Sequence, residues 1–302
     1  MAPVLAGQGP MPVPQTRSTA AVDLVCGSGQ LGPCPASTGT ITDCPQPPAE
    51  ATGFADVHTS TLTSSGSTTL PPVFALGHRT TVRACAQAAW GPPETATVTA
   101  LTVSACAWGQ GTSNGASFAP APPTASFDQV LPLNGTGSQG CSGGPAGSAT
   151  AGDFGWTLDS GGCSRAVSGP TYSGGIGPVS AGCQNALETV RANRTPIYVP
   201  VYTAVVADPD NDGDSGTPVG TDNDFDQAVY TLDGFAAFVV TGYNLPTPVR
   251  GSPFFASDWL NKTNDCTGTT FCLNGYFTQA LIPSSGSIGG PDLGAVIIRL
   301  SG

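Results

Sequence analysis

Two apolar, strand-like runs separated by an acidic loop constrain this chain most strongly. The first run covers residues 196–206 and the second covers residues 228–243. Both are rich in β-branched and aromatic side chains, which suit a pleated, half-buried strand. The loop at 207–227 is too rich in aspartate and glycine to be core. The pattern predicts a β-hairpin with a large solvated tip.

Composition favours a mainly β (α+β) protein with long loops. The 302 residues include 41 Gly and 29 Pro, only 10% are charged, and 39% are hydrophobic. That hydrophobic share is enough for a core, so wholesale disorder is not expected. Strand patterns occur at 55–65, 80–90, 96–108 and 294–300, and a helix pattern at 180–193. We therefore expect two β-rich lobes with long Gly/Pro/Ser/Thr loops and one or two short helices, stapled by disulfides.

A Gly/Ser/Pro/Ala-rich stretch at 109–150 gives the expected lobe boundary. Residues 1–20 are predicted to be a flexible tail. Residues 21–125 would then form an N-terminal β lobe with a cysteine-rich segment. Residues 126–302 would form a C-terminal β-rich lobe that carries the acidic hairpin loop.

The charge balance excludes several classes of partner. The formal net charge is −11, and the nine basic residues do not cluster, so nucleic acid and anionic membrane surfaces are not expected partners. No apolar run of about 20 residues could span a bilayer. We expect membrane contact only through a segment absent from this chain, with Met1 beginning an exported ectodomain that lacks its targeting or anchor segment.

Ten cysteines and a single lysine, Lys262, indicate disulfides formed in an oxidising compartment. Cys163 and Cys183 bracket one segment, and Cys266 and Cys272 could close a small loop. The three cysteines at 26–44 are close enough for one local pair. No C-x-x-C motif occurs, and the two histidines, His58 and His78, lie far from most cysteines and are interpreted as surface or loop residues. A zinc site is therefore not expected.

Four segments in order resemble the TadG-like proteins of high-GC Gram-positive bacteria, which are pseudopilin or minor-pilin components of tight-adherence (Flp-type) pili. The segments are LPPVFA at 70–75 with TTVRACAQAAWG at 80–91, LTVSACAW at 101–108, GDFGW at 152–156 through Cys163 and Cys183, and IYVPVY at 197–202 leading to GFAAFVVTGY at 234–243. The resemblance covers roughly residues 55–300. It implies a pilin-like N-terminal lobe, a β-rich extracellular part, and an anchoring apolar helix that is absent here. It carries no catalytic residues.

From this resemblance we expect an extracellular or cell-surface minor pilin or pilus-associated subunit, with a structural or adhesive role and no enzymatic activity. Its partners would be pilin subunits or other pilus-assembly proteins. The alternative is a free-standing secreted or anchored adhesin. It would bind a surface glycan or protein through the loops at 109–150 and 208–226.

The acidic loop has two interpretations. Oxygen ligands at alternating positions with a glycine for the turn resemble the start of a Ca²⁺ loop; the candidate ligands are Asp208, Asp210, Asp212 and Asp214. Val219 stands where an EF-hand needs a bidentate Glu, so a looser Ca²⁺ loop would complete its shell with Asp222, Asp224 or Asp226. The other interpretation is a solvated acidic turn.

Two further motifs have competing interpretations. The segment around Ser215 resembles the nucleophile loop of a secreted serine hydrolase, but neither histidine has the sequence context of a catalytic triad, which makes this a remote alternative. The four tryptophans could form a sugar-binding platform, although core or lobe-interface positions are the favoured interpretation. They are Trp90, Trp108, Trp156 and Trp259.

Overall fold

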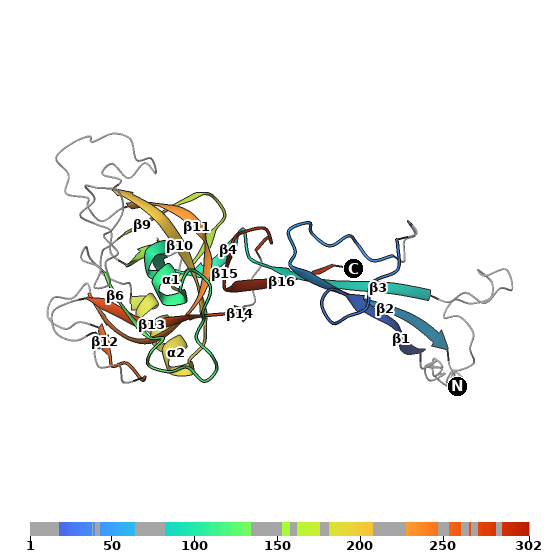
Figure 1. Cartoon of the computed structure of the whole chain (residues 1–302), viewed down its shortest axis with the longest axis horizontal. Coiled ribbons are helices and arrows are strands. Elements are labelled where there is room, and N and C mark those ends of the chain that lie inside the picture. Colours follow the sequence, from blue (N-terminus) through green and yellow to red (C-terminus); the bar gives the residue numbers. More distant parts are fainter. Residues whose placement is uncertain are drawn as a thin grey trace, which may run out of the picture. The chain divides into compact units, whose positions relative to one another are not determined.

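A computed structural model describes residues 18–37, 39, 43–63, 82–133, 153–157, 162–175, 181–207, 228–246, 254–260, 266, 271–281 and 286–301. Within these residues the fold is mainly β, with two helices and several sheets (Figure 1). The predicted fold class is confirmed. The chain divides into two compact units: unit 1 comprises residues 1–47, 53–89 and 300–302, and unit 2 comprises residues 48–52 and 90–299.

This division differs from the expected one, because the boundary at 125–126 lies inside unit 2. The reason is strand pairing over long sequence distances. Segments before residue 125 pair with strands far later in the chain, such as Val103 opposite Val201 and Val98 opposite Arg165. The loop-rich composition at 109–150 gives no sign of these pairings.

Unit 1 contains strands in the order β1 (Ser18–Gly27), β2 (Gly53–Thr63) and β3 (Val82–Gly91). β1 and β2 run antiparallel, with a register shift between Val22 and Leu24. Residues 18–20, the last three of the tail expected at 1–20, therefore belong to β1. The loop between β1 and β2 is tied down by the disulfides Cys26–Cys34 and Cys44–Cys85.

Five strands of unit 2 pair with one another in a closed ring. β10 pairs with β5, β5 with β7, β7 with β9, β9 with β11, and β11 again with β10. The strands are β5 (Thr102–Ser104), β7 (Phe154–Thr157), β9 (Thr171–Gly175), β10 (Ile197–Ala207) and β11 (Ala228–Leu245). The predicted hairpin pairing is confirmed: Ile197 lies opposite Phe238 and Ala207 opposite Ala228. Its acidic tip at 208–227 lies outside the described residues.

Buried tyrosines from three strands of this ring pack together. The rings of Tyr172 and Tyr230 stack with their centroids 5.3 Å apart, and Tyr202 meets Tyr230 edge-on at 4.9 Å. A Cβ at Gly155 would lie 2.3 Å from the Tyr230 hydroxyl, and one at Gly174 would lie 2.7 Å from the Tyr230 ring. The two glycines therefore leave the space that Tyr230 fills.

The sheet extends beyond the ring because β11 is 18 residues long and also pairs with β13. The added strands are β13 (Cys272–Thr278), β6 (Gln129–Pro132), β12 (Phe254–Ala256) and β15 (Asp292–Leu293). Two smaller pairings join β4 (Ala96–Thr99) to β8 (Ser164–Val167) and β14 (Ala280–Leu281) to β16 (Ala295–Ser301). Aliphatic and aromatic side chains of these elements form the main core, with Leu101, Val103, Phe238 and Leu273 fully buried.

The two helices compare differently with expectation. α2 (Ala181–Asn193) matches the predicted helix and buries Leu187 completely. By contrast, α1 (Ala105–Thr112) replaces the end of the strand expected at 96–108. Ser104 causes the change, because its side chain caps the helix by accepting a hydrogen bond from the Ala107 amide at 3.0 Å. Neither helix in the described residues is long and apolar enough to cross a membrane.

Candidate functional site

A hollow in unit 1 brings two disulfides next to polar side chains. We call it the disulfide pocket. It measures about 250 Å³ and lies between the cysteine-rich loop and β2. Its lining residues are Cys34, Pro35, Ala36, Ser37, Asp43, Cys44, Pro45, Gln46, Pro47, Phe54, Asp56 and His58. Phe54, Asp56 and His58 share one face of β2, because successive side chains of a strand point to opposite faces.

A buried hydrogen-bond network reaches two residues that line this pocket, Pro45 and Asp56. Gln87 on β3 is 2% exposed and Asp56 is 5% exposed. The Gln87 Nε2 amide donates to Asp56 Oδ1 at 3.0 Å and to the Pro45 carbonyl at 2.6 Å. Gln87 thereby satisfies a buried carboxylate and ties the cysteine-rich loop to the sheet. The other Asp56 oxygen lies 3.5 Å from Cys34 Sγ, which has no proton to donate because it is in a disulfide.

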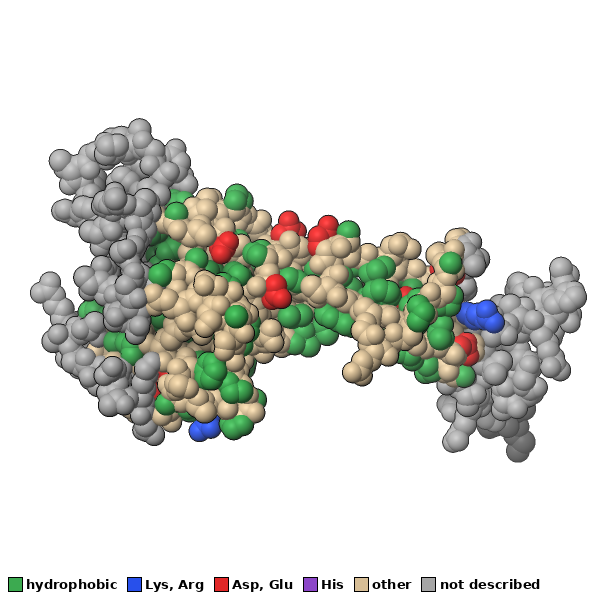
Figure 2. Space-filling model, in the orientation of Figure 1, with side chains coloured by type: hydrophobic (Ala, Val, Ile, Leu, Met, Phe, Trp, Pro, Cys, Tyr) green, Lys and Arg blue, Asp and Glu red, His purple; other side chains and the backbone are tan. Residues whose placement is uncertain are grey.

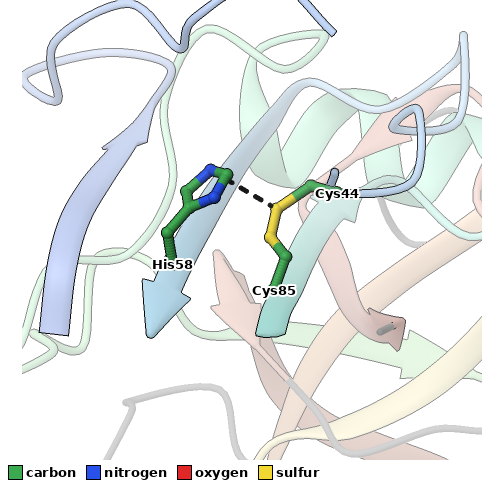
Figure 3. A group of neighbouring side chains, drawn as sticks. All are labelled: Cys44, His58 and Cys85. Carbon is green, nitrogen blue, oxygen red and sulfur yellow. Dashed lines mark hydrogen bonds between the residues drawn. A yellow bond between two sulfur atoms is a disulfide. The ribbon is translucent and has the colours of Figure 1, made fainter. Parts of the chain in front are cut away.

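His58 lies beside the Cys44–Cys85 disulfide (Figure 3). Its Nε2 atom is 3.7 Å from Cys44 Sγ, and the ring must be the donor, since a disulfide sulfur carries no hydrogen. One ligating atom from each of Cys44, His58 and Cys85 falls within 4.8 Å of the others, and all three residues are half-buried. His58 is therefore part of a strand and packed against sulfur, not a surface or loop residue as predicted.

A second hollow lies in unit 2, and we call it the polar pocket. It measures about 300 Å³ and is lined by Gln110, Gly111, Ser113, Ser117, Ser126, Phe127, Asp128 and Gln129. These residues come from the end of α1, the loop after it and the start of β6. Hydroxyl, amide and carboxylate groups beside one aromatic ring suit a small polar ligand.

Asp128 at the base of the polar pocket is only 1% exposed and accepts two hydrogen bonds from the sheet. Thr241 Oγ1 donates at 2.7 Å and Asn274 Nδ2 at 3.3 Å. Burial, and then the Asp128 charge, raise the pKa of the nearby Tyr276 hydroxyl. The Asp128 carboxylate is therefore held by side chains of two strands, β11 and β13, which fixes the back wall of the pocket.

Other perturbed groups lie inside unit 2 and not in either pocket. Burial raises the pKa of the Asp153 carboxyl from 3.8 to about 6. Burial likewise raises the pKa of the Tyr202 and Tyr230 hydroxyls above their usual range. A hydrogen bond from Arg191 lowers the pKa of Glu188. Arg191 Nε and Glu188 Oε2 are 2.8 Å apart, and both residues lie on α2. We interpret these groups as parts of the packed interior and its margin.

The sequence-predicted site residues have different outcomes. Cys163 is joined to Cys183, and Cys266 to Cys272. The four aspartates of the candidate Ca²⁺ loop (Asp208, Asp210, Asp212 and Asp214), together with Ser215 and His78, lie outside the described residues. Trp156 is in the main core and Trp108 packs against that core, whereas Trp259 packs against a smaller cluster of Ala119, Val239 and Tyr276. None of these three tryptophans lines either pocket.

The two pockets were not predicted residue by residue. The polar pocket falls in the 109–150 segment proposed for ligand binding, but Asp128 and Gln129 carried no motif. The grouping around His58 was missed because its three members are distant in sequence. The sequence signal for this grouping is that Asp56 and His58 alternate on one strand that follows a cysteine-rich loop.

Comparison with protein-family models, curated proteins and solved structures returned no match for this chain.

Proposed function

We propose that this protein is an extracellular surface subunit with a structural or adhesive role and no enzymatic activity. The observation that carries the proposal is the disulfide framework: both β-rich units are cross-linked, by Cys26–Cys34 and Cys44–Cys85 in unit 1 and by Cys163–Cys183 and Cys266–Cys272 in unit 2. Such cross-links form and persist in oxidising compartments outside the cytosol. They suit a rigid head displayed at a cell surface.

Within this class, the favoured role is a minor pilin or pilus-associated subunit of a tight-adherence system. This part of the proposal rests on the resemblance of the sequence segments between residues 70 and 243. The partners would be pilin subunits or other pilus-assembly proteins. The surface is consistent with protein partners more than with nucleic acid, since Lys and Arg side chains do not gather into a patch on the face in Figure 2.

Immunogold electron microscopy of the source cells tests the pilus role. Antibody raised against this chain should place gold on thin fibres, with gold at the fibre ends indicating a tip subunit. Gold spread over the envelope without fibres would contradict the pilus role and leave an anchored adhesin.

The polar pocket supports an adhesive role with a glycan ligand as a second candidate function. Its serine hydroxyls, glutamine amides and Asp128 carboxylate match the hydrogen-bonding groups of a sugar. Glycan-array binding by the whole protein should be lost in Ser117→Leu, which places a larger apolar side chain in the pocket. Ser168→Leu is the matched control, because Ser168 is also an exposed serine and lies outside the pocket. Equal binding by both variants would exclude the polar pocket as the binding site.

Two narrower proposals concern the acidic loop. A Ca²⁺ ion held by Asp208, Asp210, Asp212 and Asp214 would stabilise the hairpin tip, and EDTA should then lower the melting temperature. A melting temperature that neither Ca²⁺ nor EDTA changes would refute the Ca²⁺ proposal. The serine hydrolase alternative requires labelling of Ser215 by a fluorophosphonate probe, and we expect no labelling of the folded protein.

A further inference from the structure

We propose that reduction of the Cys44–Cys85 disulfide creates a binding site for a zinc-type divalent cation, with Cys44, Cys85 and His58 as its ligands. This property goes beyond the proposed surface role and does not depend on it. Two thiolates and one imidazole are a ligand set that zinc prefers, and three protein ligands leave a fourth position for water or another group.

The imidazole already stands at the distance such a site needs. Tetrahedral ligands at zinc-to-sulfur and zinc-to-nitrogen bond lengths lie about 3.6 Å from each other. His58 Nε2 is 3.7 Å from Cys44 Sγ, and the ligating atoms of all three residues lie within 4.8 Å of one another. Only the two sulfur atoms must separate. Side-chain rotation can supply that movement, because the Cα atoms are 5.2 Å apart and the sulfurs are no longer bonded after reduction.

Contacts that do not involve this disulfide hold the three ligands in place. His58 lies on β2 and Cys85 on β3, which are neighbours in the sheet of unit 1. Cys44 precedes Pro45, whose carbonyl accepts the 2.6 Å hydrogen bond from Gln87. After reduction, this hydrogen bond still connects the loop to β3 next to Cys44.

The surroundings favour a cation and allow it to enter. All three ligands are half-buried, and two of them, Cys44 and His58, line the disulfide pocket of about 250 Å³. Asp43 and Asp56 line the same pocket and bring negative charge near the site. Unit 1 also gains from a replacement cross-link, because Cys26 and Ala89 are the only buried hydrophobic side chains of this unit among the described residues. A bound ion would restore a staple that reduction removes.

The chemistry balances with a dithiol as the reductant. The dithiol supplies two electrons and two protons and becomes a cyclic disulfide, while the Cys44–Cys85 bond is replaced by two thiols. The cation then displaces both thiol protons to solvent and accepts the two thiolates and the neutral imidazole. In the oxidised protein the sulfur atoms are bonded to each other, so His58 alone cannot hold the ion.

Cobalt(II) binding by the full chain tests the proposal, since this ion reports thiolate ligands through a charge-transfer band. Protein is reduced with a phosphine, which is removed by gel filtration under nitrogen before titration. We expect no band from oxidised protein and one tightly bound equivalent after reduction. Cys44→Ser/Cys85→Ser should abolish the band, whereas Cys26→Ser/Cys34→Ser should retain it and thereby exclude the neighbouring cysteines.

His58→Gln keeps the disulfide for folding and provides the second variant. After reduction it should bind cobalt at least about 10-fold more weakly, because even the loss of an outer partner of a metal ligand costs 10-fold to 100-fold. The proposal is overturned if reduced wild-type protein shows no band. It is equally overturned if either the double serine variant or His58→Gln binds cobalt as tightly as wild type.

Discussion

Replacing Gly275 by alanine should destabilise unit 2 although the substitution adds only one methyl group. Gly275 lies in the middle of β13 and pairs with Val240 on one side and Gln129 on the other, so its backbone cannot shift freely. A Cβ there would lie 2.2 Å from Phe238 Cζ and 2.5 Å from the Val239 carbonyl oxygen. Ordinary contact between carbon atoms is about 3.5–4.0 Å.

The expected size of the effect follows from two opposing terms. Overpacking of a well-packed site costs about 1–3 kcal/mol, and the cost here is near the upper end because one contacted atom belongs to the backbone. Alanine also restricts the unfolded chain, which stabilises the protein by about 0.4–1 kcal/mol. The net expectation for Gly275→Ala is a loss of about 2 kcal/mol in the free energy of unfolding.

Urea unfolding followed by tryptophan fluorescence measures this loss directly, because all four tryptophans lie in unit 2. Gly169→Ala is the matched control: its Cβ would meet nothing closer than the Thr171 carbonyl oxygen at 3.7 Å. We expect the control to be neutral or slightly more stable than wild type. Adding Phe238→Leu to Gly275→Ala should recover only part of the loss, since the Val239 carbonyl stays in place. Equal stability of the two single alanine variants would refute the packing described around Gly275.

Three further predictions concern unit 2 and use the same unfolding assay. Leu187→Ala removes a fully buried side chain of α2 and should cost about 2–5 kcal/mol; a cost below about 1 kcal/mol would contradict its place in the core. Thr241→Val removes the 2.7 Å donor to the Asp128 carboxylate and should cost about 1.5–3 kcal/mol, and a neutral result would mean that this hydrogen bond is absent. Asp153 has its folded-state pKa raised from 3.8 to about 6, so its contribution to the free energy of unfolding should fall as pH rises from 4 to 6, by at most about 3 kcal/mol. Asp153→Asn should remove this fall, and equal slopes for the two proteins would show that Asp153 is not its cause.

The sequence predicts the hairpin of β10 and β11 well because its signal is local and redundant. Both strands combine β-branched and aromatic residues with a polar connection, and the pairing from Ile197–Phe238 to Ala207–Ala228 follows. The helix α2 is predicted for the same reason, since its apolar side chains recur at helical spacing around Leu187. In both cases one continuous segment contains the whole pattern.

The parts that could not be predicted depend on contacts between distant segments. The apolar and small residues after Ser104 are compatible with a strand, and only the capping hydrogen bond from the Ala107 amide begins a helix there. The closed ring of unit 2 needs the three-residue strand β5 to pair with both β7 and β10, and so short a strand has no distinctive pattern. The grouping of Cys44, His58 and Cys85 likewise exists only once β2, β3 and the loop have come together.

The two units reach stability by different means, and this difference bears on where the protein can fold. Unit 2 buries a large set of aliphatic and aromatic side chains, so its core can drive folding without help. Among the described residues of unit 1, by contrast, the buried side chains include Asp56, Ser60 and Gln87 beside Cys26 and Ala89. A sheet with so little buried apolar surface needs cross-links, because a small core does not offset the conformational entropy lost on folding. Reducing agent should therefore destabilise unit 1 more than unit 2, whose tryptophan fluorescence should still report a folded core. That dependence supports our proposal that the protein functions outside the cytosol. It also explains why a cation that bridges Cys44, Cys85 and His58 would matter most to unit 1.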